Sequence, residues 1–152
     1  MVVDDLKDVL QLIEMNGGGK YDKNRRNLWG KALPHLKTPV RENVWLKTMI
    51  DELPVCQAGL TALACYSMFT PPQKQVYAVS SKDWKAIKRK YPHAIIFYPD
   101  EAGYELEVWS YSPGLFANGK IVDPFSLYMS LRDIKDERVE SAMEEMMEGV
   151  EW

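Results

Sequence analysis

The sequence predicts an α+β domain in which a small sheet, mostly antiparallel or mixed, packs against several helices. Three observations favour this fold class. Apolar residues recur at helical spacing in several segments, while short segments rich in Val, Ile, Tyr and Trp have the pattern of strands. Proline and glycine clusters separate the two kinds of segment. A chain of 152 residues, 46% of them hydrophobic and 27% charged, is long enough to bury one such core.

The first predicted helix covers residues 2–15. Its apolar residues form one stripe, made of Val2, Leu6, Val9, Leu10 and Ile13. Asn16 and the three glycines that follow it end this helix, and the chain as far as Asn27 is polar, as in a flexible linker. We therefore expect residues 1–27 to form an N-terminal helix with a Gly-rich linker, and residues 28–152 to form the main domain.

The first half of the main domain alternates between helices and strands. The predicted elements are a short helix (28–33), a strand (41–47), a buried helix (57–69), a strand (75–79) and a helix (82–90). Pro34 ends the first of these helices, and Pro71 with Pro72 ends the second. Either Ser80 or Ser81 can cap the helix that begins at Lys82.

The second half begins with two more strands, at 94–98 and 104–111. The turn-rich residues between them are few enough for a hairpin. Asp123 followed by Pro124 has the form of an N-cap and a first helical residue, which predicts a helix over 125–131. Asp136 can cap a final helix with one apolar stripe, formed by Val139, Met143, Met146 and Val150. The other surface of that helix carries Glu137, Glu140, Glu144 and Glu148.

Acidic residues on one strand are the first candidates for chemistry. Glu105 and Glu107 stand two residues apart, so both point to the same face of the strand. Together with Glu101 they can share a metal ion or a proton, as in a divergent metal-dependent nuclease. The Lys of the acid-x-Lys pattern used by nuclease folds is missing here. The alternative interpretation is the solvent-facing row of a half-exposed sheet.

The other polar motifs lack a companion that catalysis requires. His35 and His93 each stand beside a proline, with no spacing that implies an orienting partner. No serine lies in a Gly-x-Ser-x-Gly context, and the glycines before Lys20 lack the spacing of a phosphate-binding loop. Cys56 and Cys65 are expected to be buried as small hydrophobic residues. We therefore expect no enzyme activity, no cofactor and no metal site.

Charge and hydropathy limit the partners. The net charge of -3 argues against nucleic-acid binding by the whole domain. A helical patch of Lys85, Lys88 and Arg89, within the basic segment 82–90, keeps nucleic-acid binding as an alternative. The sequence has neither a signal peptide at its start nor an apolar run of ~20 residues for a membrane span, so it is expected to be cytoplasmic and not membrane-bound.

Several blocks resemble a known family. The block from Asp123 to Leu131, followed by Asp136 to Val139 and by Trp152, is similar to the end of AbiEi-type antitoxin regulators from bacteria. Earlier blocks resemble the same group: Leu28-Trp29, Leu33, Thr38-Pro39-Val40 and the segment from Ala58 to Ala64. The resemblance covers about residues 28–152, and its motifs are fold signatures that carry no catalytic group.

The resemblance implies a type IV toxin–antitoxin function. Such regulators join a DNA-binding winged helix to a C-terminal domain that acts against a nucleotidyltransferase toxin. Because 27 residues are too few for a winged helix, the resemblance implies a C-terminal domain alone, with DNA binding assigned to a missing N-terminal part.

The sequence thus predicts a non-enzymatic regulatory or antitoxin domain that acts through protein–protein contacts, with a cognate nucleotidyltransferase-type toxin as the implied partner. Two surfaces are candidates for these contacts. One is the basic segment after the glycines, with Lys20, Lys23, Arg25 and Arg26. The other is the acidic last helix, with Glu137, Glu140, Glu144 and Glu148.

Overall fold

A five-stranded mixed sheet packed against helices forms the described part of the protein, which confirms the predicted α+β class. Helices lie on both faces of the sheet, which the sequence does not predict. The computed structural model describes residues 6–15, 23–48, 53–99 and 103–150. The helices are α1 (Leu6–Met15), α2 (Lys23–Ala32), α3 (Gly59–Tyr66), α4 (Ser81–Lys90), α5 (Pro124–Leu131) and α6 (Glu137–Glu148), with short 3₁₀ turns at Leu33–His35 and Pro92–Ala94. The strands are β1 (Val40–Leu46), β2 (Cys56–Gln57), β3 (Val76–Ser80), β4 (Ile95–Ile96) and β5 (Tyr104–Trp109).

The strand order is β2-β3-β5-β1-β4. β3 and β5 run parallel, and the other neighbouring strands pair antiparallel. β5 lies at the centre, where Glu107 faces Asn43 of β1 on one side and Ala78 of β3 on the other. Side chains alternate between the two faces of a strand. Trp109 of β5 therefore shares its face with Glu107, and Leu106 and Val108 point to the opposite face.

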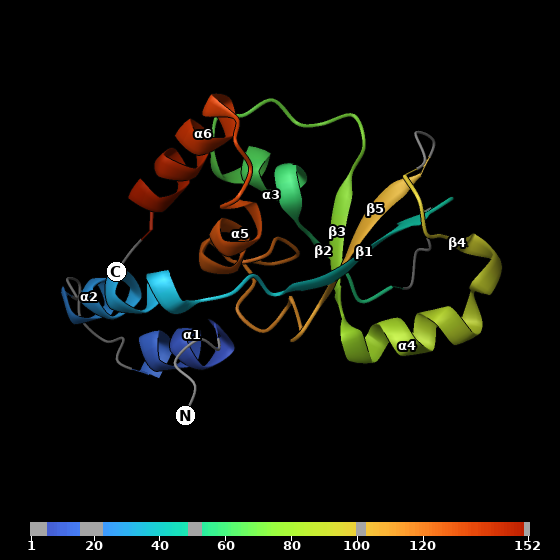
Figure 1. Cartoon of the computed structure of the whole chain (residues 1–152), viewed down its shortest axis with the longest axis horizontal. Coiled ribbons are helices and arrows are strands. Elements are labelled where there is room, and N and C mark those ends of the chain that lie inside the picture. Colours follow the sequence, from blue (N-terminus) through green and yellow to red (C-terminus); the bar gives the residue numbers. More distant parts are fainter. Residues whose placement is uncertain (1–5, 16–22, 49–52, 100–102, 151–152) are drawn as a thin grey trace.

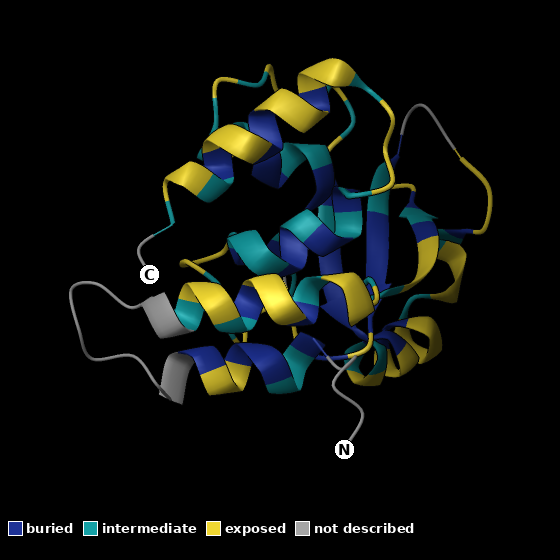
Figure 2. Ribbon diagram, turned by 60° about the vertical axis from the view of Figure 1, so that its left-hand side comes forward, coloured by how far each residue is buried: buried dark blue, intermediate teal, exposed yellow. Residues whose placement is uncertain are grey.

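Each face of the sheet has its own core. On one face α4 contributes Trp84 and Ile87, which pack against apolar residues of β1, β3 and β5. The larger core lies on the other face and is covered by α1, α2, α3, α5 and α6. Figure 2 shows that α6 turns a buried side toward this core and an exposed side outward. Both faces of the central strand are thus removed from water.

The N-terminal helix α1 belongs to the larger core. Its apolar residues Leu6, Val9, Leu10 and Ile13 are all buried there. α1 packs beside α2, and the Arg25 Nε of α2 donates a hydrogen bond to the Ile13 carbonyl oxygen at 2.9 Å. The core therefore crosses the predicted boundary at residue 28. None of the helices in the described ranges is long and apolar enough to cross a membrane.

Several predicted elements have different limits in the structure. The polar chain before Asn27 is not a linker throughout, because α2 already begins at Lys23, whereas residues 16–22 lie outside the described part. The predicted helix over 57–69 is shorter: Cys56 and Gln57 pair with β3, and α3 ends at Tyr66. Proline position and apolar periodicity located these helices but did not set their ends.

The predicted hairpin between the strands at 94–98 and 104–111 is wrong. β4 pairs with β1, and β1 also pairs with β5, so β1 lies between the two strands. β4 consists only of Ile95–Ile96, and the two residues after it, Phe97 and Tyr98, are exposed. A short connection permits a hairpin but does not require one, because the distant β1 offers two pairing edges.

Ser80 is the N-cap of α4. Its hydroxyl accepts a hydrogen bond from the Asp83 backbone N–H at 3.1 Å, whereas Ser81 is already the first helical residue. We expect Ser80→Ala to lower the free energy of unfolding by about 1 kcal/mol. Ser81→Ala is the matched control and should change it by only a few tenths of a kcal/mol. Equal losses in urea denaturation of the two variants would contradict this assignment.

Candidate functional sites

The acidic strand residues do share a face, but they are not a solvent-facing row. Glu107 is only 6% exposed, and its carboxylate accepts a hydrogen bond from the Trp109 indole Nε1 at 3.0 Å. Burial raises the pKa of Glu107 to about 7. The pKa of the half-buried Glu105 is also raised by burial, while the amide of Asn43, 3.4 Å from its carboxylate, acts in the opposite direction.

The interpretation of these acids as exposed residues is therefore wrong for Glu107, because helices cover this face as well. The third acid of the nuclease hypothesis, Glu101, lies outside the described residues. Within the described ranges, no three His, Cys, Asp or Glu side chains are grouped so that they could hold a metal ion. Glu105 and Glu107 have separate hydrogen-bond partners, and nothing in their geometry specifically favours nuclease chemistry.

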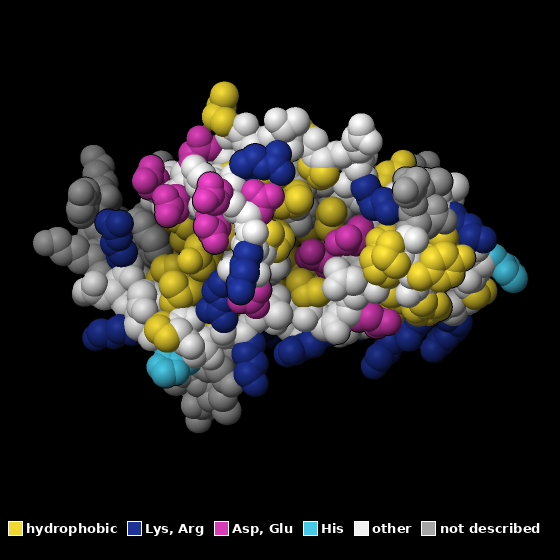
Figure 3. Space-filling model, turned by 45° about the horizontal axis from the view of Figure 1, so that its top comes forward, with side chains coloured by type: hydrophobic (Ala, Val, Ile, Leu, Met, Phe, Trp, Pro, Cys, Tyr) yellow, Lys and Arg dark blue, Asp and Glu magenta, His cyan; other side chains and the backbone are white. Residues whose placement is uncertain are grey.

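The acidic face of α6 is open to solvent. We use the term acidic surface for its four exposed glutamates: Glu137, Glu140, Glu144 and Glu148. Asp136 caps this helix as predicted, since its carboxylate accepts from the Arg138 N–H at 2.8 Å, and Val139, Met143 and Met146 are buried on the opposite side. Figure 3 shows Asp and Glu side chains gathered over this helix. The predicted burial of the apolar stripe and exposure of the glutamates are thus confirmed, while contact of the acidic surface with a partner stays a prediction.

A groove of about 570 Å³ lies beside the acidic surface, between α6 and the chain that follows α3. Its walls include Met68, Phe69 and Ala142. The backbone N–H of Met68 donates to a Glu145 carboxylate oxygen at 2.6 Å, which attaches this loop to α6. The Met68 side chain is 89% exposed, an unusual position for a large apolar side chain. An acidic helix face and an accessible apolar side chain thus border one groove.

The predicted basic segment near the N-terminus is only partly visible. Lys20 lies outside the described residues, and for Lys23 only the backbone is described. Arg25 is half-buried and holds α2 against the end of α1 through its bond to Ile13. Arg26 is exposed. The hydrogen bond of Arg25 therefore gives this residue a structural role, which is to join α2 to α1.

The basic residues of α4 form an exposed patch, as the helical spacing predicts. Lys85, Lys88 and Arg89 are all exposed. The Lys88 ammonium lies 5.6 Å from the centre of the Trp84 ring, and basic residues fill the last turn, where the helix dipole favours positive charge. These contacts stabilise α4 itself, which gives the basic residues a structural role. They leave the three side chains accessible to a partner.

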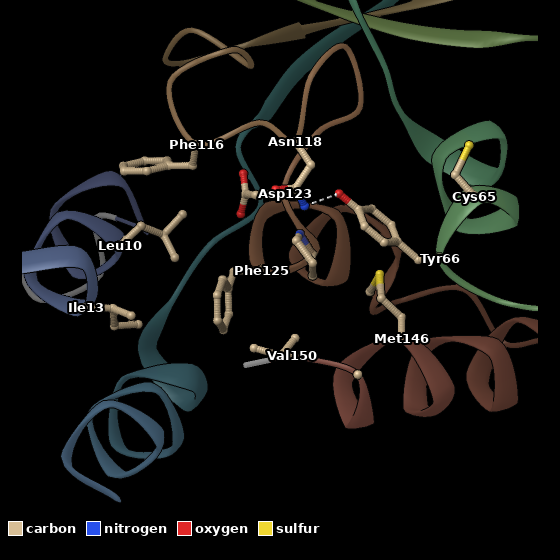
Figure 4. A pocket seen from close by; sticks show the side chains of 12 residues that line it. Leu10, Ile13, Cys65, Tyr66, Phe116, Asn118, Asp123, Phe125, Met146 and Val150 are labelled. Atoms are coloured by element: carbon tan, nitrogen blue, oxygen red, sulfur yellow. Dashed lines mark hydrogen bonds between the residues drawn. The ribbon is translucent and has the colours of Figure 1, made fainter. Parts of the chain in front are cut away.

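A partly open cavity of about 570 Å³ lies between α1, α3, α5 and the end of α6 (Figure 4). Its wall has both apolar and polar parts, and the apolar side chains come from helices far apart in the sequence, with Leu10 and Ile13 from α1 and Met146 from α6. Phe125 of α5 is held in place by an edge-to-face contact with Trp29, at 4.8 Å between ring centres. A cavity of this size with few polar groups is typical of small-molecule sites.

Asp123 is the acidic group of this cavity. It caps α5 as predicted, because its Oδ2 accepts a hydrogen bond from the Ser126 N–H at 2.9 Å. Its second oxygen, Oδ1, is buried and has no hydrogen-bond partner among the described residues. Burial raises the pKa of Asp123 to about 6, against the effect of the Ser126 hydrogen bonds. A buried carboxylate with one unused oxygen is costly, and a donor supplied from outside would reduce that cost.

Two further polar side chains of the cavity are held in fixed positions. The Tyr66 hydroxyl donates to the Val122 carbonyl oxygen at 2.7 Å and accepts from the Asn118 side-chain amide at 2.8 Å. Cys65 lies at the edge with its sulfur turned away from Asp123 (Figure 4). Its thiol donates to the Gln57 side-chain oxygen at 3.3 Å, and Cys65 is exposed, contrary to the prediction that both cysteines are buried.

Sequence reasoning identified Asp123 as a helix cap and missed its place in a cavity. The Asp-Pro pair indicates the cap by itself, because capping is a local arrangement. The cavity requires α1 and the end of α6 to come together around α5, and no local pattern reports that. The two histidines considered as catalytic candidates, His35 and His93, are exposed and lie on the 3₁₀ turns at Leu33–His35 and Pro92–Ala94.

Comparisons of the chain with protein-family models, curated proteins and solved structures found no match. The resemblance to AbiEi-type regulators therefore stays a prediction.

Proposed function

We propose that this protein is a non-enzymatic regulatory or antitoxin domain that binds a partner protein through the acidic surface of α6 and the groove beside it. The observation that supports this most is the row of four exposed glutamates on α6, of which Glu137 lines the groove, next to the exposed Met68 side chain on the opposite wall. Exposed apolar residues rimmed by charge are typical of protein-binding surfaces.

Among the described residues, no cation neutralises the charges of the acidic surface. None of the four glutamates forms an ion pair with a described residue; the ion pair near them joins Arg138 to Asp136 at 3.3 Å. Glu140, Glu144 and Glu148 follow one another at intervals of four residues, so like charges repel along one side of the helix. A partner that brings Lys or Arg side chains would relieve this repulsion and raise the rate of association.

The partner expected from this surface presents a basic segment with at least one apolar side chain. The basic side chains would face the acidic surface, and the apolar side chain would enter the groove against Met68 and Phe69. The resemblance of the sequence to AbiEi-type antitoxins suggests a nucleotidyltransferase-type toxin as this partner.

Reversing one charge of the acidic surface should weaken partner binding. We expect Glu144→Lys to raise the Kd for the nucleotidyltransferase-type toxin about tenfold, because an attraction becomes a repulsion. Calorimetric titration at two ionic strengths measures this, and the loss should shrink at high salt. Glu42→Lys, which makes the same charge change at an exposed position of β1, is the matched control and should leave the Kd unchanged.

The groove has its own test. Met68→Ser removes the exposed apolar side chain without touching the buried core, so toxin binding should weaken while the thermal stability stays the same. Co-expression of the toxin with the full chain provides the functional readout, which is rescue of bacterial growth. If the unmodified chain neither formed a complex with the toxin nor rescued growth, the antitoxin function would be rejected. Equal effects of Glu144→Lys and Glu42→Lys would instead reject the acidic surface as the contact.

A further inference from the structure

We propose that the cavity between α1, α3, α5 and α6 binds a small primary amine with an apolar body, whose ammonium group pairs with the free Oδ1 of Asp123. This site is separate from the acidic surface, which lies on the outer side of α6. The proposal rests on three observations: the size of the cavity and the apolar side chains in its wall, the unpartnered buried carboxylate oxygen, and the hydrogen-bonding character of the remaining polar groups.

The polar groups of the cavity select a donor. Asp123 Oδ1 can only accept when the carboxylate is ionised, and its neighbour Oδ2 already accepts from Ser126. The Tyr66 hydroxyl donates to Val122, and one of the two N–H groups of the Asn118 amide donates to Tyr66. The thiol of Cys65 also donates within the protein. The charged group that a ligand meets in this cavity is therefore the acceptor Asp123 Oδ1, and a group with several N–H donors is its complement.

The missing positive charge also points to an amine. Of the described residues that line the cavity, none is Lys, Arg or His. A buried carboxylate without a cation is destabilising, and an ammonium group placed next to it would recover much of that cost. Because Oδ1 is itself buried, an amine reaches it only when the Asp123 side chain turns toward the cavity, and a compact terminal group requires a smaller movement than a substituted one. This favours a primary amine over a secondary or tertiary amine.

The walls favour a flat apolar body. The Phe125 ring is fixed by its contact with Trp29, and the Phe116 ring by an edge-to-face contact with Tyr111, at 6.3 Å between ring centres. Figure 4 shows these two rings on the same side of the cavity as Leu10, with the Asp123 carboxylate between them and Tyr66. Rings held in this way can stack on an aromatic or cyclic ligand, and their faces also attract a cation.

The test uses the full chain and three primary amines of increasing size: cyclohexylmethylamine, 2-phenylethylamine and tryptamine. Binding is followed by NMR titration of the ¹⁵N-labelled protein, with the Ser126 amide as reporter because it bonds to Asp123. We expect at least one amine to give a saturable shift there. The neutral analogue of 2-phenylethylamine, 2-phenylethanol, should bind about tenfold more weakly. No saturable shift with any of the three amines would overturn the proposal, as would equal affinity for the alcohol.

Asp123→Asn is the decisive variant. Asparagine is also a good N-cap, so α5 keeps its cap while the carboxylate charge is lost. We expect amine affinity to fall about tenfold or more, with 2-phenylethanol affinity little changed. Asp136→Asn makes the same change at the exposed N-cap of α6 and should have no effect on binding. An Asp123→Asn protein that binds the amine as well as the unmodified chain would overturn the proposal.

A second variant and a pH series test the site without removing Asp123. Val150→Trp should fill the cavity from its rim and abolish amine binding, and retained binding would place the amine elsewhere. The amine remains a cation from pH 8 to pH 5, whereas Asp123, with its pKa of about 6, becomes protonated over this interval. The other titratable groups of the described wall are Tyr66 and Cys65. The side chains that α1, α5 and α6 contribute to this wall are apolar and do not titrate. Affinity should therefore fall toward pH 5, and a pH-independent affinity would contradict pairing with Asp123.

Discussion

Replacing Glu107 with glutamine is expected to stabilise the protein at pH 8 by roughly 3 kcal/mol and to leave its stability near pH 4.5 almost unchanged. Glutamine preserves the side-chain oxygen that accepts from the Trp109 indole at 3.0 Å, so the hydrogen bond remains while the charge is lost. Urea denaturation at several pH values measures the effect. The physical reason is the cost of an ionised carboxylate inside a sheet covered on both faces.

The pH range follows from the two pKa values of Glu107. Burial raises its pKa from 4.5 to about 7 in the folded chain. Between these values the folded protein holds a proton that the unfolded chain has lost, so the free energy of unfolding falls as the pH rises. Below pH 4.5 both states are protonated and no cost remains. Above about pH 7 both are ionised, and the whole penalty is present in the folded state.

The control for this prediction is Glu42→Gln on the exposed side of β1, which should not change the pH dependence. Some pH dependence will persist in the Glu107→Gln protein, because burial also raises the pKa of Asp123, from 3.8 to about 6. The remaining decline should therefore end near pH 6 rather than near pH 7. An unmodified protein whose stability is constant between pH 4.5 and pH 7 would contradict the burial of Glu107.

Replacing Gly59 with alanine is expected to lower the free energy of unfolding by about 2–4 kcal/mol. Gly59 begins α3 with a φ of +54°, a backbone conformation that costs side-chain-bearing residues roughly 1–2 kcal/mol. In addition, a Cβ at this position would lie 2.9 Å from the Cγ1 of Val76 on β3. Contact at that distance forces β3 and α3 apart, because both are packed in the larger core.

Gly119 separates the two contributions. It also has a positive φ, +62°, but a Cβ there would meet no atom within 4 Å. Gly119→Ala should therefore show the backbone cost alone, about 1–2 kcal/mol. The difference between the two variants in urea denaturation measures the clash with Val76. Indistinguishable losses would show that α3 does not approach β3 as closely as described.

Local chemistry was readable from the sequence. The caps at Asp123 and Asp136 and the stripe of α6 depend on residues a few positions apart, and the structure contains each of them. Hydrogen bonds between a capping side chain and the next turn are short-range, so the residues that make them are neighbours in sequence. The acidic surface was predicted for the same reason, since helical spacing alone places its glutamates together.

Errors occurred where distant segments compete for one position. The connection of residues 97–103 has the length of a hairpin, yet β1 lies between β4 and β5. Alternation placed Glu105 and Glu107 on one face, but it could not tell that helices also cover this face and bury Glu107. In each case the outcome depends on contacts between residues far apart in the chain, for which periodicity carries no information.

By itself, the sequence determined the fold class, the positions of most helices and strands, and the acidic character of the last helix, because these follow from spacing and capping within single turns or strands. Only the tertiary structure decided that α1 joins the main core, that Glu107 is buried beside Trp109, and that Asp123 borders a cavity with one free oxygen. Burial changes the energy of an ionised carboxylate, and burial arises only when elements from different parts of the chain pack together.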